Sequence, residues 1–174
     1  MQVRVEHRFP QPSGLVWQLL TDVECAAGLG PEHTAARWVD ERRGVGARFV
    51  GTNSRDGRVW QVSCQVLSWR SPNAFAWAVG PPQCPKATWR YALIPQGAGC
   101  LVVQTFRHGP GRSFLRAAVQ TRPEQAEQLV ASRAAELRIN MTVVLAGAKQ
   151  LLSRGWHLNP PPVRGWTPYR RLSS

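Results

Sequence analysis

A run of short segments with alternating apolar and polar residues is followed by one long amphipathic segment, and this order constrains the fold most strongly. The alternation has the period of β-strands, in which successive side chains point to opposite faces of a sheet. Since the turns between the segments are short, we expect an antiparallel meander. The predicted strands are residues 36–40, 47–54, 58–69, 74–79, 87–94 and 100–108.

Residues with turn chemistry separate these strands. Asp56 and Gly57 give the strongest signal, because this dipeptide favours a two-residue hairpin turn. Prolines, glycines and an asparagine mark later reversals, at residues 71–73, 80–82 and 95–97. The hairpin around Asp56 contains no recognisable catalytic pattern, so we interpret it as one wall of an internal pocket.

The N-terminal segment predicts one further strand and two short helices. Residues 1–9 alternate like a strand, which two prolines end, and residues 13–20 have the pattern of a short amphipathic helix. Thr21 and Glu24 have the spacing of a capping box, which predicts a second short helix. We interpret Asp22 as a carboxylate near the free backbone N–H groups of that helix start, which gives it a structural role rather than that of a catalytic acid.

The period changes to that of an α-helix from Pro123 to about Leu152, and a proline suits the first turn of a helix. Such a helix is about 45 Å long and is the only predicted element large enough to cover one face of the sheet. The sequence therefore predicts an α+β helix-grip fold, with a curved antiparallel sheet of seven strands around this helix. The apolar stripe of the helix consists of Leu129, Leu137, Met141, Val144, Leu145, Ala148 and Leu152.

Residues 1–152 are predicted to form one domain, and residues 153–174 an extended tail with many prolines and arginines and no acidic residue. The chain has no signal-peptide pattern at its start and no apolar stretch near the roughly 20 residues that span a bilayer. We therefore expect a cytoplasmic protein. Its four cysteines form no C-x-x-C pair, which predicts free thiols and no structural zinc site.

The formal net charge of +12 comes almost entirely from arginine, since Lys86 and Lys149 are the only lysines. A basic chain can bind nucleic acid, an anionic membrane or an acidic ligand. The arginines are scattered, however, whereas nucleic-acid-binding proteins usually concentrate their charge on one element. We attribute the charge to a compositional bias towards arginine and predict no nucleic-acid partner.

Bulky side chains recur at alternate positions of several predicted strands and would face the long helix. Such residues can line a ligand pocket, which is typically apolar with a few polar anchors, or they can fill the space completely. We predict that they line a pocket. The candidate ligand-binding residues are Trp60, Cys64, Trp77 and Trp89 on the sheet, with Leu137 and Met141 on the helix.

Several short patterns resemble the START-like superfamily, also called SRPBCC, in its polyketide cyclase/dehydrase and lipid-transport branch. The resemblance covers about residues 1–152 and implies a helix-grip fold with a hydrophobic pocket for lipids, polyketides or other polycyclic ligands. Members of the superfamily include enzymes, carriers, hormone receptors and chaperone cofactors, so the resemblance implies no single activity. It is carried by residues 16–17, 20–24, 46–49, 57–60, 75–77 and 89–91, and by Arg133, Leu137, Asn140, Met141, Leu145 and Lys149 on the helix.

Arg133 and Asn140 lie seven residues apart, on or beside the apolar stripe of the long helix. A polar group in that position needs a partner in the protein, in water or in a ligand. They could anchor a ligand oxygen, or they could bond strand carbonyls or the short helices.

His108, at the end of the last strand, could act as an acid or base near neutral pH. Tyr91 shares a strand face with Trp89, while Arg90 points to the other face. The Tyr91 hydroxyl could donate a hydrogen bond to a ligand carbonyl or enolate, or it could find its hydrogen-bond partner within the core.

The chain contains no Ser-His-Asp set, phosphate-binding glycine loop, H-E-x-x-H pattern or paired carboxylates, and its histidines lack the spacing of metal ligands. We therefore expect no metal and no cofactor. The leading prediction is a polyketide cyclase/dehydrase-type enzyme that holds a polycyclic intermediate during cyclisation, dehydration or isomerisation. A non-catalytic carrier of a hydrophobic small molecule is the first alternative, and an adaptor whose basic tail binds an acidic protein partner is the second.

Overall fold

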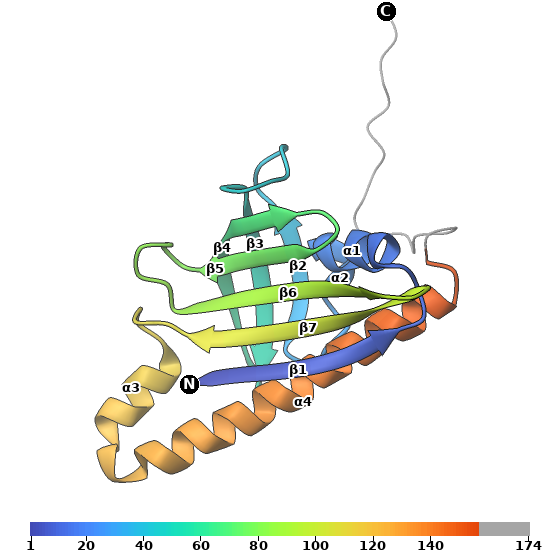
Figure 1. Cartoon of the computed structure of the whole chain (residues 1–174). Helices are drawn as coiled ribbons and strands as arrows, with labels where there is room; N and C mark the ends of the chain where they lie inside the picture. Colours follow the sequence, from blue (N-terminus) through green and yellow to red (C-terminus); the bar gives the residue numbers. More distant parts are fainter. Residues whose placement is uncertain (157–174) are drawn as a thin grey trace, which may run out of the picture.

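A single antiparallel sheet of seven strands curves around a long C-terminal helix in the computed structural model, which describes residues 1–156 (Figure 1). The strands are β1 (Gln2–Phe9), β2 (His33–Trp38), β3 (Arg48–Arg55), β4 (Arg58–Arg70), β5 (Ala74–Val79), β6 (Ala87–Gln96) and β7 (Gly99–His108). Their order in the sheet is β1-β7-β6-β5-β4-β3-β2, so the meander is interrupted only where β1 pairs with β7.

The helices lie on one side of the sheet and at its ends. They are α1 (Ser13–Thr21), α2 (Val23–Ala26), α3 (Phe114–Thr121), the 3-10 helix η1 (Pro123–Gln125) and α4 (Ala126–Ser153). Figure 1 shows α4 crossing below the sheet, with α1 near its C-terminal end and α3 near its N-terminal end. The predicted α+β helix-grip class is confirmed.

The predicted strands agree closely with those observed, with one shift at the edge of the sheet. Residues Asp56 and Gly57 both have positive φ, 50° and 74°, and form the predicted tight turn between β3 and β4. β2 begins at His33, three residues before the predicted start, and its pairing with β3 is irregular between His33 and Ala35. That irregularity breaks the alternation on which the prediction was based.

The predicted capping box at Thr21 is wrong. Thr21 is the last residue of α1, and its Oγ1 donates to the carbonyl of Trp17 at 2.8 Å. Asp22 caps α2 instead, because its Oδ1 accepts from the backbone N–H of Cys25 at 3.0 Å. Glu24 accepts from the backbone N–H of Trp38 at 3.4 Å and so connects α2 to β2. The structural role expected for Asp22 is therefore confirmed, although Asp22 itself is the cap and not Thr21.

Helix α3 is absent from the sequence prediction. Ser113 caps it by accepting from the backbone N–H of Arg116 at 3.1 Å. None of its residues is fully buried, but Leu115, Ala118 and Val119 are half-buried at helical spacing, so an amphipathic pattern was present and the sequence analysis missed it. The long helix has the predicted extent, although its first turn, from Pro123, is a 3-10 helix.

Two apolar clusters hold α4 against the sheet. The larger cluster joins α1 to the C-terminal half of α4 and includes Leu19, Leu20, Phe75 and Leu145. The smaller one joins β1, β6 and β7 to the middle of α4, and its buried residues are Val3, Ala87, Phe106, Leu137 and Met141. Within residues 1–156, no helix is both long and apolar enough to span a bilayer.

Replacing Leu145 by alanine should lower the free energy of unfolding by about 2–5 kcal/mol, because the substitution opens a void in the larger cluster. Leu145 is 0% exposed, whereas Val143 on the outward side of α4 is 42% exposed. The control Val143→Ala should change the free energy of unfolding by less than about 0.5 kcal/mol in the same urea denaturation series. Similar losses in both variants would contradict this packing.

Candidate functional site

A cavity of about 1310 Å³ lies between the inner face of the sheet and α4. Ligand sites in proteins commonly occupy about 300–1,000 Å³, so this space can take a ligand of several fused rings. The bulky side chains of the sheet therefore line a hollow and do not fill it. The cavity wall includes residues of β3 to β7, of α3 and of the N-terminal half of α4.

Aromatic rings form one continuous wall of this cavity. Trp77 and Trp89 are direct cross-strand partners, and their rings are stacked with centroids 6.1 Å apart and planes 10° from parallel. Phe106, the partner of Trp89 on β7, completes the row with an edge-to-face contact at 4.8 Å. Leu137 and Met141 of α4 pack against Phe106 from the opposite side. A flat apolar ligand can stack on this wall.

A second cross-strand row contains two polar residues, Tyr91 and Gln104. They lie directly opposite each other on β6 and β7, and Gln104 Nε2 donates to Tyr91 Oη at 3.3 Å. Burial raises the pKa of the Tyr91 hydroxyl well above its ordinary value, so the phenol stays protonated. The sequence analysis missed Gln104. The signal was a polar residue at an inward position of β7, between Val102 and Phe106.

Arg133 and Asn140 both bind Glu32, which lies in the loop before β2. Arg133 donates from Nη2 to Oε1 of Glu32 at 2.7 Å and from Nη1 to Oε2 at 2.9 Å, and Asn140 Nδ2 donates to Oε2 at 3.0 Å. Although partial burial disfavours the guanidinium cation, these bonds and that to Glu136 hold the pKa of Arg133 above its ordinary value. The two residues line the cavity, yet their main partner is a carboxylate of the protein itself.

Glu32 was also missed by the sequence analysis. Its loop gives no periodic pattern, and its partner Arg133 lies 101 positions away in the chain. The loop packs tightly on α4. A Cβ atom on Gly30 would lie 2.5 Å from a methyl group of Val144, and one on Gly147 would lie 3.2 Å from the carbonyl oxygen of Leu29. Only glycine permits this close approach.

His108 forms a hydrogen bond with the residue that caps α3. Its Nε2 lies 2.8 Å from Ser113 Oγ, and both side chains line the cavity. Partial burial, together with the nearby charges of Arg116 and the N-terminal amine, lowers the pKa of His108 below its ordinary value of 6.5. The imidazole is therefore mainly neutral at pH 7 and shares one hydrogen bond with the Ser113 hydroxyl.

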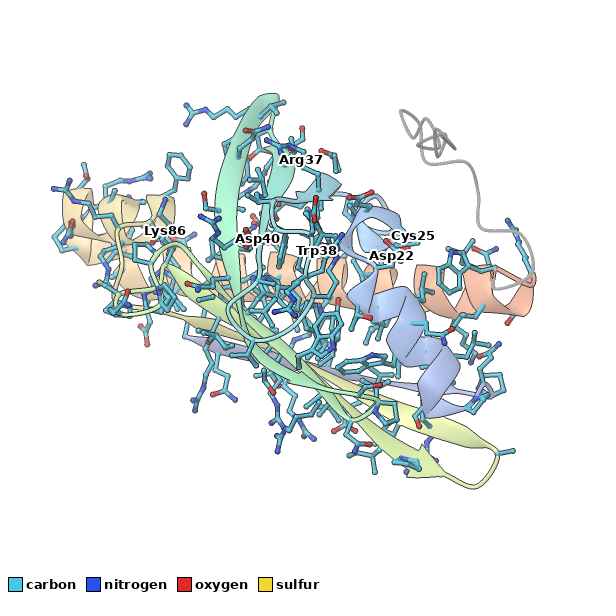
Figure 2. All side chains as sticks on the ribbon, turned by 90° about the horizontal axis from the view of Figure 1, so that it is seen from above. Asp22, Cys25, Arg37, Trp38, Asp40 and Lys86 are labelled. Atoms are coloured by element: carbon cyan, nitrogen blue, oxygen red, sulfur yellow. The ribbon has the colours of Figure 1, made fainter. Side chains whose placement is uncertain are left out.

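The cavity opens at the end where α3 lies. Trp60 on β4 contacts Phe114 on α3 edge-to-face, with ring centroids 6.0 Å apart. Phe114 is 71% exposed, whereas the lining residues near α1, such as Leu20, are buried. Figure 2 shows Lys86 on the side of α3, away from Asp22 and Cys25 near α2. The exposed basic residues of the lining are Arg55, Arg58, Lys86, Arg112 and Arg122.

All the candidate residues named from the sequence lie on this one cavity. Tyr91, His108, Arg133 and Asn140 each contribute to its lining, as do Trp60, Cys64, Trp77, Trp89, Leu137 and Met141. Burial raises the pKa of the Cys64 thiol to about 12, so this thiol is un-ionised and contributes apolar surface. Within residues 1–156, no three His, Cys, Asp or Glu side chains are grouped as metal ligands.

The sheet, the long helix and the cavity between them define a START-like helix-grip protein. The chain belongs to the family described as polyketide cyclase / dehydrase and lipid transport, whose model matches residues 1–138. This membership supports ligand binding within the fold. No curated protein matches the chain.

Solved structures share this fold at low sequence identity. TTHA0849 from Thermus thermophilus has a TM-score of 0.66 and 18% identity, covering 89% of this chain and 99% of that chain. The Polyketide_cyc-like protein Cgl2372 from Corynebacterium glutamicum has a TM-score of 0.62 and 19% identity, covering 92% and 96%. An AHSA1-like protein from Aeromonas hydrophila has a TM-score of 0.57 and 16% identity, covering 89% and 94%. These likenesses establish the fold alone.

Replacing Glu32 by glutamine should lower the free energy of unfolding by about 2–3 kcal/mol, because it leaves the half-buried Arg133 guanidinium with only the more exposed Glu136 as a charged partner. Both side chains of that ion pair are less than one-fifth exposed, at 16% and 18%. Glu136, which is 42% exposed, provides the control. Glu136→Gln should cost less than about 1 kcal/mol in the same denaturation assay. Equal costs would show that the Glu32 pair is no stronger than a surface ion pair.

Proposed function

We propose that this protein binds a hydrophobic polycyclic small molecule in the cavity and catalyses a cofactor-independent cyclisation or dehydration of it. The observation that carries the proposal is the open cavity itself, with the stacked pair Trp77 and Trp89 on one wall. The apolar wall favours a ligand whose rings stack on the indoles. Family membership supports the binding part of the proposal.

His108 is the residue best suited to move a proton. Its lowered pKa keeps it in the basic form at neutral pH, and it lies on the cavity wall beside Ser113. In a dehydration, His108 would take a proton from the carbon next to a ligand carbonyl, directly or through the Ser113 hydroxyl. The carbon–oxygen bond of the β-hydroxyl group would then break, and the imidazolium would return the proton to form water.

The second candidate function is a carrier that binds the same ligand without turnover. It is favoured by the bonds of Arg133 and Asn140 to Glu32, which occupy two of the polar groups that could otherwise act on a ligand. An adaptor function would depend on the basic tail, and residues 157–174 lie outside the described part of the chain. The cavity therefore supports the two ligand-binding candidates and offers nothing for the adaptor.

Replacing Met141 by tryptophan should fill part of the cavity and weaken ligand binding. We expect the affinity for the neutral fluorescent probe N-phenyl-1-naphthylamine to fall at least roughly tenfold, a change of about 1.4 kcal/mol. Met141 lines the cavity, whereas Ile139 on the same helix is 64% exposed and gives the matched control Ile139→Trp. The measurement is a fluorescence titration, with circular dichroism to confirm folding. Unchanged binding in folded Met141→Trp would place the probe elsewhere and contradict the proposal.

The dehydration of 3-hydroxy-1-tetralone to 1-naphthol and water tests the catalytic part. If His108 is the general base, kcat/KM should be constant near neutral pH and fall as the pH drops below 6.5, because the pKa of His108 is lowered from that value. His108→Gln should reduce the rate by about 10²–10⁴-fold, the usual contribution of a general base. The absorbance of 1-naphthol reports turnover. Binding of the tetralone without any turnover by the wild type would favour the carrier.

A further inference from the structure

We infer that Tyr91 and Gln104 form an anchor that binds a neutral hydroxyl group at the buried end of the ligand. The inference rests on the proposed binding of a polycyclic ligand and adds the chemical class of that ligand. It makes the ligand a fused-ring alcohol, phenol or enol, and excludes a plain hydrocarbon and a carboxylate with its charged end inside.

Gln104 is buried with an unused hydrogen-bonding atom. The residue is only 3% exposed and lines the cavity, and its Oε1 has no hydrogen-bond partner among the described residues. Buried polar groups are nearly always paired, because an unpaired one loses its bonds to water and gains nothing in return. An apolar residue would serve this position better if its only role were packing. The unpaired oxygen therefore indicates a partner that the protein chain does not supply.

The pair presents one donor and one acceptor side by side. Tyr91 Oη accepts the hydrogen bond of Gln104 Nε2, so the phenolic proton is free to donate to a ligand. Gln104 Oε1 is free to accept. A ligand hydroxyl satisfies both groups at once, since it accepts from Tyr91 and donates to Gln104. If the amide were turned by 180°, a hydroxyl would still match, because Tyr91 Oη could accept from it while the amide N–H donates to it.

A carboxylate does not fit this position. Its two oxygens are both acceptors and would face the Gln104 oxygen, which is also an acceptor. Its charge would also lose its hydration with no cation beside it to compensate. Lys86, immediately before β6, lies five positions from Tyr91, or about 17 Å along the extended chain. Arg133 is already bound by Glu32 through both terminal nitrogens. Only a neutral group is therefore stabilised at the anchor.

The position of the anchor fixes how the ligand lies. Tyr91 belongs to the apolar cluster at the closed end of the cavity, while the opening is near Phe114 at the other end. The stacked pair Trp77 and Trp89 lies one row closer to the opening than Tyr91. His108 follows Gln104 by four positions on β7, which corresponds to about 13 Å. A ligand held at the anchor thus presents its ring system to the indoles and its far end to His108.

Three probes with the same ring system test the anchor: pyrene, 1-hydroxypyrene and 1-pyrenecarboxylate. We expect the wild type to bind 1-hydroxypyrene at least roughly tenfold more tightly than either of the other two. Gln104→Leu and Tyr91→Phe should each weaken the binding of 1-hydroxypyrene by about tenfold and leave pyrene within about twofold. Thr105→Val, a neighbouring change on the outer face of β7, should alter neither. Fluorescence titrations measure all affinities, with thermal denaturation to confirm that each variant is folded.

The outcomes test the anchor inference separately from the proposed binding of a ligand in the cavity. If the wild type binds pyrene and 1-hydroxypyrene equally, or if Gln104→Leu weakens both alike, the anchor is wrong while ligand binding stands. Tight binding of 1-pyrenecarboxylate, or binding of N-phenyl-1-naphthylamine without binding of 1-hydroxypyrene, also overturns the anchor. Failure of the wild type to bind any of these probes overturns the proposed function, and the anchor with it.

Discussion

The hollow in this protein depends on how α4 is held, which is by the two edges of the sheet. At one edge, Val3 of β1 packs on Leu137 and Met141. At the other edge, Glu32 of the loop before β2 binds Arg133 of the same helix. A twisted sheet fastened at both edges bows away from the helix between them. The space under β4, β5 and β6 follows from that constraint, and the side chains there are free to serve a ligand.

The interior divides along the helix axis into a packed half and an open half. Near α1 the aromatic rings fill space, as in the edge-to-face contact of Trp17 with Trp69 at 5.6 Å. Towards α3 the rings line the cavity, as in the stacked pair of Trp77 and Trp89. The packed half supplies the stability that a partly hollow domain needs. This division explains how the same residue type can be core at one end and cavity wall at the other.

Features encoded by local patterns could be predicted from the sequence, and features formed by distant pairs could not. The Asp56–Gly57 turn and the inward orientation of Tyr91 follow from turn chemistry and from the period of a strand. The ion pair of Glu32 with Arg133 joins residues that no periodicity relates. Helix α3 has an apolar face, but its eight residues give that pattern only two turns, and the prediction missed it. The prediction of which residue caps α2 failed for a different reason. Both Thr21 and Asp22 are good capping residues, and only the end of α1 at Thr21 decides between them.

In the proposed function, recognition and chemistry would occupy different depths of the cavity. Tyr91 and Gln104 lie at the closed end, where water is excluded and a neutral hydrogen bond is strongest. His108 lies near the opening, beside the cap of α3, where a catalytic base of the proposed reaction would exchange its proton with solvent. A carrier needs only the deep pair, because binding alone requires no proton transfer. The pair Tyr91 and Gln104 and the pair His108 and Ser113 line the same cavity but make no polar contact with each other. A change at His108 could therefore alter catalysis in the proposed reaction without altering which ligand Tyr91 and Gln104 select.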